Sequence, residues 1–240
     1  MKQLLKQILT FLHISVTRNQ KYDAYTRKII RQTLKTDSCC VDIGCHKGEI
    51  LDLMLQSSSK GLKYGFEPIP ELFNSLREKY KSDPTVVINP TALYNTTGKT
   101  TFQYVINAPA YSGIKKRKYD GKNVEIEQIT VNTGLMDDII PADICIDLMK
   151  IDVEGAEFQV MKGALAILKR CKPVVIFEFG LGAADFYGST PELLYQFITN
   201  DCGMRISTLK GYLCNQPSLT KEKLSILFEL GKEYYFVAHP

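Results

Sequence analysis

VDIGCHKGEI, residues 41–50, decides the fold, because it leads from an apolar strand through two glycines into a helix. This order begins nucleotide-binding α/β folds, since glycine permits the sharp turn and the close approach of a ligand. Gly44 and Gly48 are spaced Gly-x-x-x-Gly, and His46 stands where the dinucleotide fingerprint requires glycine. The motif therefore favours a nucleotide-like ligand other than a dinucleotide. An ordinary strand-to-helix turn is the alternative.

Short β-rich runs alternate with helical stretches along the rest of the chain. Parallel strands need helical crossovers, so the alternation predicts an α/β fold with a mostly parallel sheet and helices on both faces. The predicted strands are residues 39–43, 62–67, 85–89, 147–153 and 173–179. The predicted helices between them are residues 49–56, 70–80 and 156–170.

Two regions depart from this alternation. Residues 100–105 and 124–132 are β-rich and flank a polar, basic segment, which predicts an antiparallel excursion from the sheet. After residue 180 we expect a helix from Pro191, a strand over residues 204–209 and a last strand over residues 233–239.

Residues 1–37 are interpreted as amphipathic N-terminal helices that pack on a single domain, residues 38–240. A basic amphipathic helix on a membrane surface is the alternative. No run of about 18 apolar residues occurs, and the apolar part of the N-terminus is short, so neither a transmembrane helix nor export is expected. The apolar positions at helical spacing are Leu4, Leu5, Ile8, Leu12, Ile29 and Ile30.

The composition is that of an ordinary folded protein. The chain has 240 residues, of which 45% are hydrophobic and 23% are charged, and this excludes disorder and coiled coil. A formal net charge of +4 is too small to indicate a nucleic-acid binder. The 7 cysteines include no CxxC pair and there are 3 histidines. We therefore expect reduced thiols, no structural zinc and a cytoplasmic location.

Acidic residues stand where two predicted strands end. Glu67, beside the glycine turn, is suited to accept hydrogen bonds from both hydroxyls of a ribose. In residues 148–164, Asp152 and Glu154 crowd the carboxyl end of a buried strand, where open α/β sheets bind ligands. Such dense charge is costly unless it meets a ligand, an ion or another charge. Glu157 suits the dipole of the following helix, so Asp152 is retained as the functional residue.

These motifs together resemble the FkbM family of S-adenosylmethionine-dependent methyltransferases. The resemblance covers residues 39–180, and KIDVEGAE is its most specific part. It implies a Rossmann-like class I methyltransferase fold with a seven-stranded sheet, whose last strand runs antiparallel. The stretches that carry it are VDIGCHKGEI, GFEPIPELFNSL, INPTALYNTTGKTTF, LMKIDVEGAEFQVMKGA and PVVIFEF.

Carried over residue by residue, the resemblance implies a cofactor site for S-adenosyl-L-methionine. Glu67 would hold the ribose, and the turn from Asn89 to Ala92 would border the adenine. Asp152 and Glu154 would lie beside the sulfonium and the acceptor. The methionine half of the cofactor would be lined by Asp42, Gly44 and Gly48.

The chemistry of the cofactor sets what the protein must do. The sulfonium methyl group is already activated, so the protein chiefly aligns the acceptor oxygen and accepts a proton. Asp152 or Glu154 is the candidate general base. A divalent cation held by Asp152 with Glu154 or Glu178 is the alternative, but oxygens spread over two strands favour it weakly, and we expect no metal.

The acceptor is expected to bind at the basic loop, residues 110–122. Lys115 and Arg117 could hold a phosphate or an acidic sugar, and Tyr111 could stack on a ring. A solvated loop is an equally good interpretation of such a charge run. Residues 181–190 are a second candidate, because they follow a core strand and would overhang the same edge.

The preferred function is O-methylation of a hydroxyl on a small-molecule or glycan-like acceptor. Methylation of RNA is the first alternative, but the chain lacks an Asn-Pro-Pro-Tyr-like run and an aromatic platform for single strands. A catalytically idle module that binds a cofactor or a partner is the second alternative. The missing glycine disfavours a nicotinamide dehydrogenase.

Overall fold

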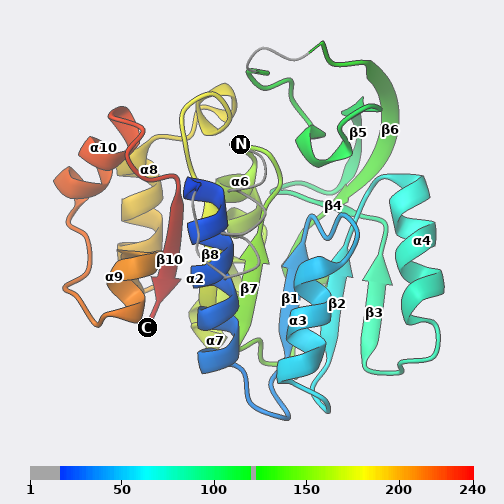
Figure 1. Cartoon of the computed structure of the whole chain (residues 1–240), viewed down its shortest axis with the longest axis horizontal. Coiled ribbons are helices and arrows are strands. Elements are labelled where there is room, and N and C mark those ends of the chain that lie inside the picture. The colour runs from blue at the N-terminus through cyan, green and yellow to red at the C-terminus, as the bar shows by residue number, and fades with distance from the viewer. Residues whose placement is uncertain (1–16, 120–122) are drawn as a thin grey trace, which may run out of the picture.

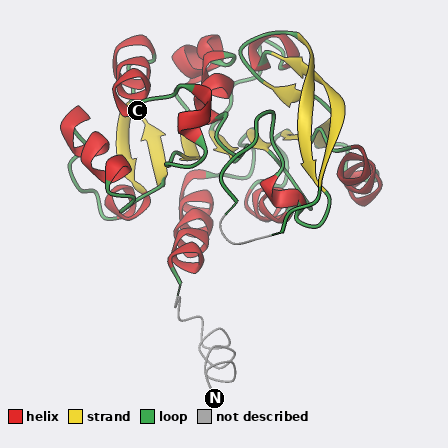
Figure 2. Ribbon diagram, turned by 90° about the horizontal axis from the view of Figure 1, so that it is seen from above, coloured by secondary structure: helices red, strands yellow, loops and turns green. Residues whose placement is uncertain are grey.

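Figure 1 shows the computed structural model of the chain, which describes residues 17–119 and 123–240. The predicted helical positions Leu4, Leu5, Ile8 and Leu12 lie outside the described residues. A central sheet is flanked by helices on both faces, and a smaller sheet stands apart from it, as the view from above makes clear (Figure 2).

The central sheet has seven strands in the order β3-β2-β1-β7-β8-β10-β9. They are β1 (Cys40–Ile43), β2 (Lys63–Phe66), β3 (Val86–Asn89), β7 (Leu148–Ile151), β8 (Val174–Glu178), β9 (Arg205–Thr208) and β10 (Tyr235–His239). The first five of these pair in parallel, and β10 is antiparallel to both of its neighbours. This confirms the predicted Rossmann-like sheet with its antiparallel last strand. The strand order reverses between β1 and β7, which is where such sheets bind ligands.

Helices bury the two faces of this sheet. One face packs against α2 (Arg18–Thr33), α3 (Glu49–Ser57), α4 (Pro70–Tyr80) and α9 (Leu209–Leu213). The other packs against α5 (Met136–Ile139), α6 (Glu157–Lys162), α7 (Leu165–Cys171), α8 (Pro191–Gln196) and α10 (Lys221–Glu229). Successive strand residues alternate between the faces: Val41 and Ile43 join the second group, and Cys40 joins the first.

The stretch predicted as one helix over residues 156–170 forms two helices, α6 and α7, and the break has a packing cause. A Cβ at Gly163 would lie 2.0 Å from the carbonyl oxygen of Tyr94, so only glycine fits this crossing. The Asp137 carboxylate then accepts the N–H groups of Ala166 and Ile167 at 2.8 and 3.0 Å. These bonds satisfy free donors at the start of α7, so the second helix has a cap of its own.

The predicted antiparallel excursion is confirmed. β5 (Gly98–Val105) and β6 (Ile126–Gly134) pair antiparallel along their length, and β4 (Ala92–Leu93) pairs in parallel with β6. These three strands form the smaller sheet, which rises above the end of the main sheet where β1 and β7 finish (Figure 1). It supplies a second wall for a site at that edge.

Helix α2 covers the strands near the centre of the sheet and runs along them, beside α3 (Figure 1). Thr17 begins it with a capping box, in which its hydroxyl accepts the Gln20 N–H and the Gln20 side chain accepts the Thr17 N–H. Ile29 and Ile30 are fully buried in the apolar cluster of this face. The polar side of the helix faces outward, so its burial follows the amphipathic pattern.

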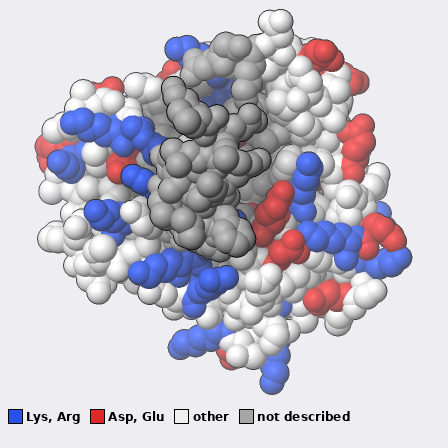
Figure 3. Space-filling view, in the orientation of Figure 1, with Lys and Arg blue, Asp and Glu red and all other residues white. Residues whose placement is uncertain are grey.

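The outer surface carries mixed charge. On the face seen in Figure 3, Lys and Arg side chains gather on the left and at the lower edge, whereas most of the visible Asp and Glu side chains lie on the right, mixed with basic ones. Among residues 17–119 and 123–240, no helix has the length and apolar character needed to cross a bilayer.

The turn after β1 touches the end of β7 at Gly44. Its φ is +80°, and a Cβ there would lie 2.0 Å from the carbonyl oxygen of Asp152. Glycine at this position is therefore required by the protein's own backbone, whether or not a ligand approaches. The contact brings the two central strand ends together at the switch point.

Replacing Gly44 with alanine should destabilise the fold by about 3 kcal/mol or more, because a backbone clash adds to the cost of left-handed φ. Gly231→Ala is the matched control, since Gly231 has φ +56° and a Cβ added there would meet no atom within 4 Å. The control should lose only about 1 kcal/mol. Urea unfolding measures both, and equal losses in the two variants would contradict the backbone contact.

Candidate active site

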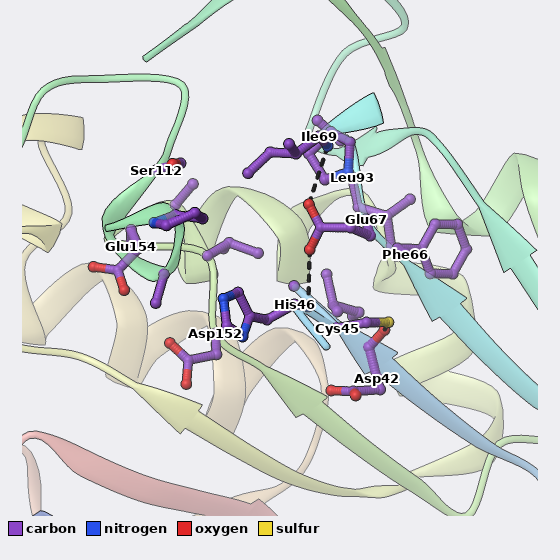
Figure 4. Close-up of a pocket in the computed structure, with 18 of the residues that line it drawn as sticks. Asp42, Cys45, His46, Phe66, Glu67, Ile69, Leu93, Ser112, Asp152 and Glu154 are labelled. Atoms are coloured by element: carbon purple, nitrogen blue, oxygen red, sulfur yellow. Dashed lines mark hydrogen bonds between the residues drawn. The ribbon is translucent and has the colours of Figure 1, made fainter. Parts of the chain in front are cut away.

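A cavity of about 270 Å³ lies at the carboxyl ends of β1, β2 and β7. Carboxylates from the strand ends face it, and apolar side chains from the smaller sheet, including Leu93 and Phe102, close it. In Figure 4, Glu67 and Asp152 reach toward the cavity from opposite sides, with His46 between them. An enclosed apolar space with a few convergent polar groups is typical of a small-molecule site.

Glu67 is held in the cavity by backbone donors. Its Oε2 accepts the N–H of His46 at 2.8 Å, and its Oε1 accepts the N–H of Ile69 at 3.0 Å (Figure 4). Burial raises the pKa of Glu67 to about 7, although the two backbone hydrogen bonds act to lower it. A carboxylate has about four lone-pair positions, so roughly two remain for a ligand.

Asp42 lines the same cavity from β1 and is 2% exposed. Its Oδ2 forms no hydrogen bond within the part of the chain that the structure describes. Burial raises the pKa of Asp42 to about 7, while the nearby Lys150 ammonium acts to lower it. An unpaired buried carboxylate oxygen is costly, which marks Asp42 as a group that a ligand could satisfy.

The other predicted cofactor residues divide into two groups. Gly44 and Ala92 line the cavity. Gly48 begins α3, and a Cβ there would lie 2.5 Å from the hydroxyl oxygen of Tyr80. Asn89 accepts the N–H of Thr91 at 2.9 Å through its side chain. Gly48 and Asn89 therefore shape the turns that present other residues to the cavity.

Asp152, just beyond the end of β7, is held by two donors. Lys150 Nζ lies 2.7 Å from its Oδ2, and the Tyr235 hydroxyl donates to the same oxygen at 2.6 Å. Burial alone would raise the pKa of Asp152, but the Lys150 charge and both hydrogen bonds bring it below its ordinary value. The Asp152 carboxylate is therefore ionised at neutral pH.

Glu154 forms an ion pair with Arg117, and both side chains are largely buried. The φ of Glu154 is +60°, an unfavourable value for a residue with a side chain. The next residue, Gly155, has φ +107° and packs against the backbone of Ala183. Strained loops of this kind persist where the surrounding structure holds them, and they are common at functional sites.

Glu178, at the end of β8, places a third carboxylate beside those of Asp152 and Glu154. One oxygen each of Asp152, Glu154 and Glu178 lies within 4.8 Å of the others, close enough to share a cation. Two of these carboxylates already pair with Lys150 and Arg117. The expectation of a metal-free site therefore stays a prediction.

A second cavity, of about 690 Å³, adjoins the first and shares Ala110, Asp152 and Glu154 with it. Its wall is rich in tyrosine, with side chains from α2, the basic loop and β10. Two of the three predicted acceptor residues, Tyr111 and Arg117, line this cavity. The tyrosines are Tyr22, Tyr111, Tyr119, Tyr234 and Tyr235.

The third predicted acceptor residue, Lys115, joins the two candidate acceptor loops to each other. Its N–H donates to the Tyr187 hydroxyl at 2.8 Å, and its Nζ donates to the carbonyl of Phe186 at 2.9 Å. Lys118 N–H donates to the carbonyl of Gly182 at 3.0 Å. Lys115 therefore supports the wall of the second cavity and does not line it.

Several residues of this second cavity were not predicted from the sequence. Tyr22, Tyr234 and Tyr235 come from the first described helix and the last strand, far from the motifs. No local pattern marks them, because only the tertiary fold brings these elements together. Glu178 did carry a signal: it ends an apolar strand, as Glu67 follows one.

Glu157 has a structural role, as its position at the start of a helix predicts. Its Oε1 accepts the N–H groups of Val153 and Gly155 at 3.0 and 3.2 Å. Its Oε2 has no hydrogen bond among the described residues, and Glu157 is 1% exposed. Burial raises the pKa of Glu157 to about 7.

This raised pKa makes the stability dependent on pH. The folded state keeps the Glu157 proton up to about pH 7, whereas the unfolded state loses it near the ordinary value of 4.5, so stability falls as pH rises between these values. Glu157→Gln should stabilise the protein by about 1 kcal/mol at pH 5, where the unfolded state is already partly ionised, and on the order of 3 kcal/mol at pH 8. Denaturant unfolding at both pH values checks this, and the same difference at pH 5 and pH 8 would contradict it.

Comparisons with known proteins agree with this architecture. A crystal structure of methyltransferase FkbM from Methylobacillus flagellatus KT is similar, with a TM-score of 0.51 and 16% identity over 86% of this chain. The match spans 44% of that structure's chain, so this chain covers less than half the length of the protein it resembles. At such low identity the likeness shows the fold alone.

Two further solved structures resemble the chain more weakly. An rRNA methylase from Streptococcus thermophilus has a TM-score of 0.46 and 9% identity, over 89% of this chain and 91% of its own. A protein from Streptococcus mutans, solved in complex with SAH, has a TM-score of 0.48 and 10% identity, over 93% of this chain and 98% of its own. No curated protein matches.

The family model described as "Methyltransferase FkbM domain" matches residues 42–206, well over half of the chain. The matched region contains the glycine turn, Glu67, the three carboxylates at the sheet edge and the basic loop. The resemblance seen in the sequence is thereby confirmed: the chain belongs to the FkbM methyltransferase family.

Proposed function

We propose that the chain transfers the methyl group of S-adenosylmethionine to a hydroxyl oxygen of a small-molecule or glycan-like acceptor. The observation that carries the proposal is that two cavities meet at Asp152 and Glu154. One has walls suited to a nucleoside, and the other is lined by tyrosines. Methyl transfer requires two ligands to be aligned end to end, and adjoining cavities provide this.

The first cavity fits the cofactor in three respects. Glu67 retains lone pairs for the ribose hydroxyls, and Asp42 has a buried oxygen without a partner in the described chain. Ile69, Leu93 and Phe102 offer an apolar wall for a purine ring. We therefore assign direct cofactor contacts to Asp42, Gly44, Glu67 and Ala92, and supporting roles to Gly48 and Asn89.

The residues at the junction would orient the acceptor and take its proton. S-adenosylmethionine, when bound, supplies a methyl group that is already activated. Lys150 and Tyr235 both occupy Oδ2 of Asp152, which leaves Oδ1 for the acceptor hydroxyl. An oxygen that gains a methyl group becomes a far stronger acid than a carboxylic acid, so Asp152 can accept its proton despite a lowered pKa.

Glu154 contributes through Arg117, which it holds at the edge of the second cavity. Arg117 Nε and the Tyr119 hydroxyl are buried and form no hydrogen bonds with the described residues. They are therefore suited to bind the hydroxyl groups of an acceptor. Tyrosine faces suit the apolar faces of sugar rings, which favours a glycan-like molecule.

The alternative functions receive less support. Among the described residues that line the second cavity, carboxylates outnumber cations, which disfavours the phosphate backbone of RNA. An idle cofactor-binding module would bind S-adenosylmethionine without turnover. A turnover measurement therefore separates this alternative from the proposal.

The cofactor assignment predicts the effect of Glu67→Gln, which keeps the shape of the side chain but removes its charge and one acceptor. Affinity for S-adenosylmethionine should fall about 10- to 100-fold, because the charged acceptor for the ribose is lost and one of the two backbone N–H groups that Glu67 holds loses its acceptor. Calorimetric titration with S-adenosylmethionine, and separately with NAD, measures this. The exposed Glu78→Gln is the control. Unchanged affinity in Glu67→Gln, or preference for NAD, would reject the assignment.

The chemical assignment predicts the effect of Asp152→Asn. Label should pass from methyl-labelled S-adenosylmethionine into base-stable ethers when a panel of hydroxylated metabolites and glycans is offered. The variant should lose about 100-fold or more in turnover, because general bases contribute about this much, while it still binds the cofactor. Label in RNA, or in base-labile esters, would point to another acceptor class. Cofactor binding without any transfer would support the idle module.

A further inference from the structure

The second cavity has more negative than positive groups among its described lining residues. Its cations are Arg18, Arg117 and Lys118, whereas its acids are Asp23, Asp152, Glu154, Glu178 and Glu233. Even with Glu178 protonated, four carboxyl groups face three cations, and an excess of acids disfavours anionic ligands and favours cationic ones. The acidic wall was not visible from the sequence, because it combines helix α2, the ends of β7 and β8, and the segment before β10.

Both arginines of this cavity are engaged by the protein itself. Arg117 forms the ion pair with Glu154. Arg18 Nη1 donates to the carbonyl of Gly231 at 2.7 Å, and its guanidinium lies 5.7 Å from the Tyr234 ring centroid. These contacts reduce what the two arginines can offer to an anion. The ion pair engages Glu154 as fully as Arg117, so Glu178, whose side chain has no such partner among the described residues, is the acid left to meet a cation.

Glu178 differs from its two neighbours because its side chain forms no ion pair and no hydrogen bond with the described residues. It ends β8, opposite Tyr235 in the register of the sheet. Burial raises the pKa of Glu178 to about 8, and the charges of Asp152 and Glu157 add to the effect. Arg117 and Lys150 act in the other direction but do not compensate. A further positive charge beside Glu178 would relieve this unfavourable environment.

Tyrosine rings border the same space. Tyr22 lies 4.8 Å from Tyr234 and 5.1 Å from Tyr235, measured between ring centroids. Lys150 Nζ already lies 5.0 Å from the centroid of Tyr235, so this ring can accept a cation. Aromatic faces beside a carboxylate are the usual surroundings of a protonated or quaternary amine in a protein site.

We propose that the acceptor is a hydroxylated small molecule that also carries a protonated amine, held by Glu178 and the neighbouring tyrosine rings. Amino sugars have this chemistry. The inference rests on the proposed function, because it names the class of molecule that would enter the second cavity. The amine binds at Glu178, and a hydroxyl of the same molecule reaches Asp152 at the junction of the two cavities.

Binding of such a cation has a measurable consequence at neutral pH. Near pH 7.5 Glu178 holds its proton in the free protein, and a bound ammonium group favours the ionised carboxylate. The groups that face Glu178 come from every element packed against it: Asp152 and Lys150 from the β7 end, Glu157 from α6, Arg117 from the basic loop, Tyr234 just before β10 and Tyr235 from β10. Asp152 is already ionised, so the released proton comes from Glu178.

The test compares three probes that differ in charge: 6-amino-6-deoxyglucose, glucose and glucuronate. The first carries its amine on the primary carbon, so it stays protonated at pH 7.5, where binding is measured by NMR titration with the protein alone and with saturating S-adenosylhomocysteine. The amino sugar should bind on the order of tenfold more tightly than glucose, and glucuronate more weakly than either. Calorimetry in two buffers of different ionisation enthalpy should detect proton release with the amino sugar only.

Glu178→Gln should remove both the preference for the amino sugar and the proton release. Glu78→Gln, an exposed acid on α4 far from the cavity, should keep both. Proton release in the unmodified protein tests the idea even if Glu178→Gln fails to fold. Equal affinity for all three probes, preference for glucuronate, or no binding of any probe would overturn it. Failure of S-adenosylhomocysteine to bind would count against the proposed function instead, because the probe preference is also measured without it.

Discussion

The contact between the glycine turn after β1 and the end of β7 governs the geometry of the whole site. At Gly44 the backbone passes so close to the Asp152 carbonyl that a Cβ would lie 2.0 Å from its oxygen. This contact fixes the position of Asp152, which lines both cavities, relative to the glycine turn, which lines the first cavity. A longer separation would leave two unrelated cavities. The close approach instead gives them a common wall.

The sheet pattern was predictable because it depends on local signals. Apolar runs, their spacing and the glycine turn identify the parallel strands and their helices, and Glu67 and Asp152 stand at strand ends that the sequence reveals. The break between α6 and α7 was not predictable, because it depends on the carbonyl of Tyr94, far away in the chain. The tyrosine-rich wall of the second cavity was not predicted for the same reason: Tyr22 and Tyr235 become neighbours only when α2 packs beside β10.

Charge at the basic loop shows why a local pattern can mislead about a ligand. The run of lysines and arginine suggested an anionic acceptor, since no partner for them was visible in the sequence. In the folded chain Arg117 pairs with Glu154, and Lys115 joins its own loop to residues 186 and 187. Opposite charges come from distant elements, so the net field of a cavity follows from the tertiary fold.

The carboxylates at this edge of the sheet are wholly or partly removed from water, and they differ in the hydrogen bonds that compensate for the lost hydration. Glu67 and Glu157 each accept two backbone N–H groups, and Asp152 accepts a lysine and a tyrosine. Glu178 has none of these partners in the described chain, and its pKa is raised the furthest of the three glutamates, to about 8. Glu178 is half-buried, and a carboxyl group that is partly removed from water without a partner is destabilising to the fold. Its position on the wall of the second cavity provides a functional reason for that instability, since a cationic ligand would supply the missing partner.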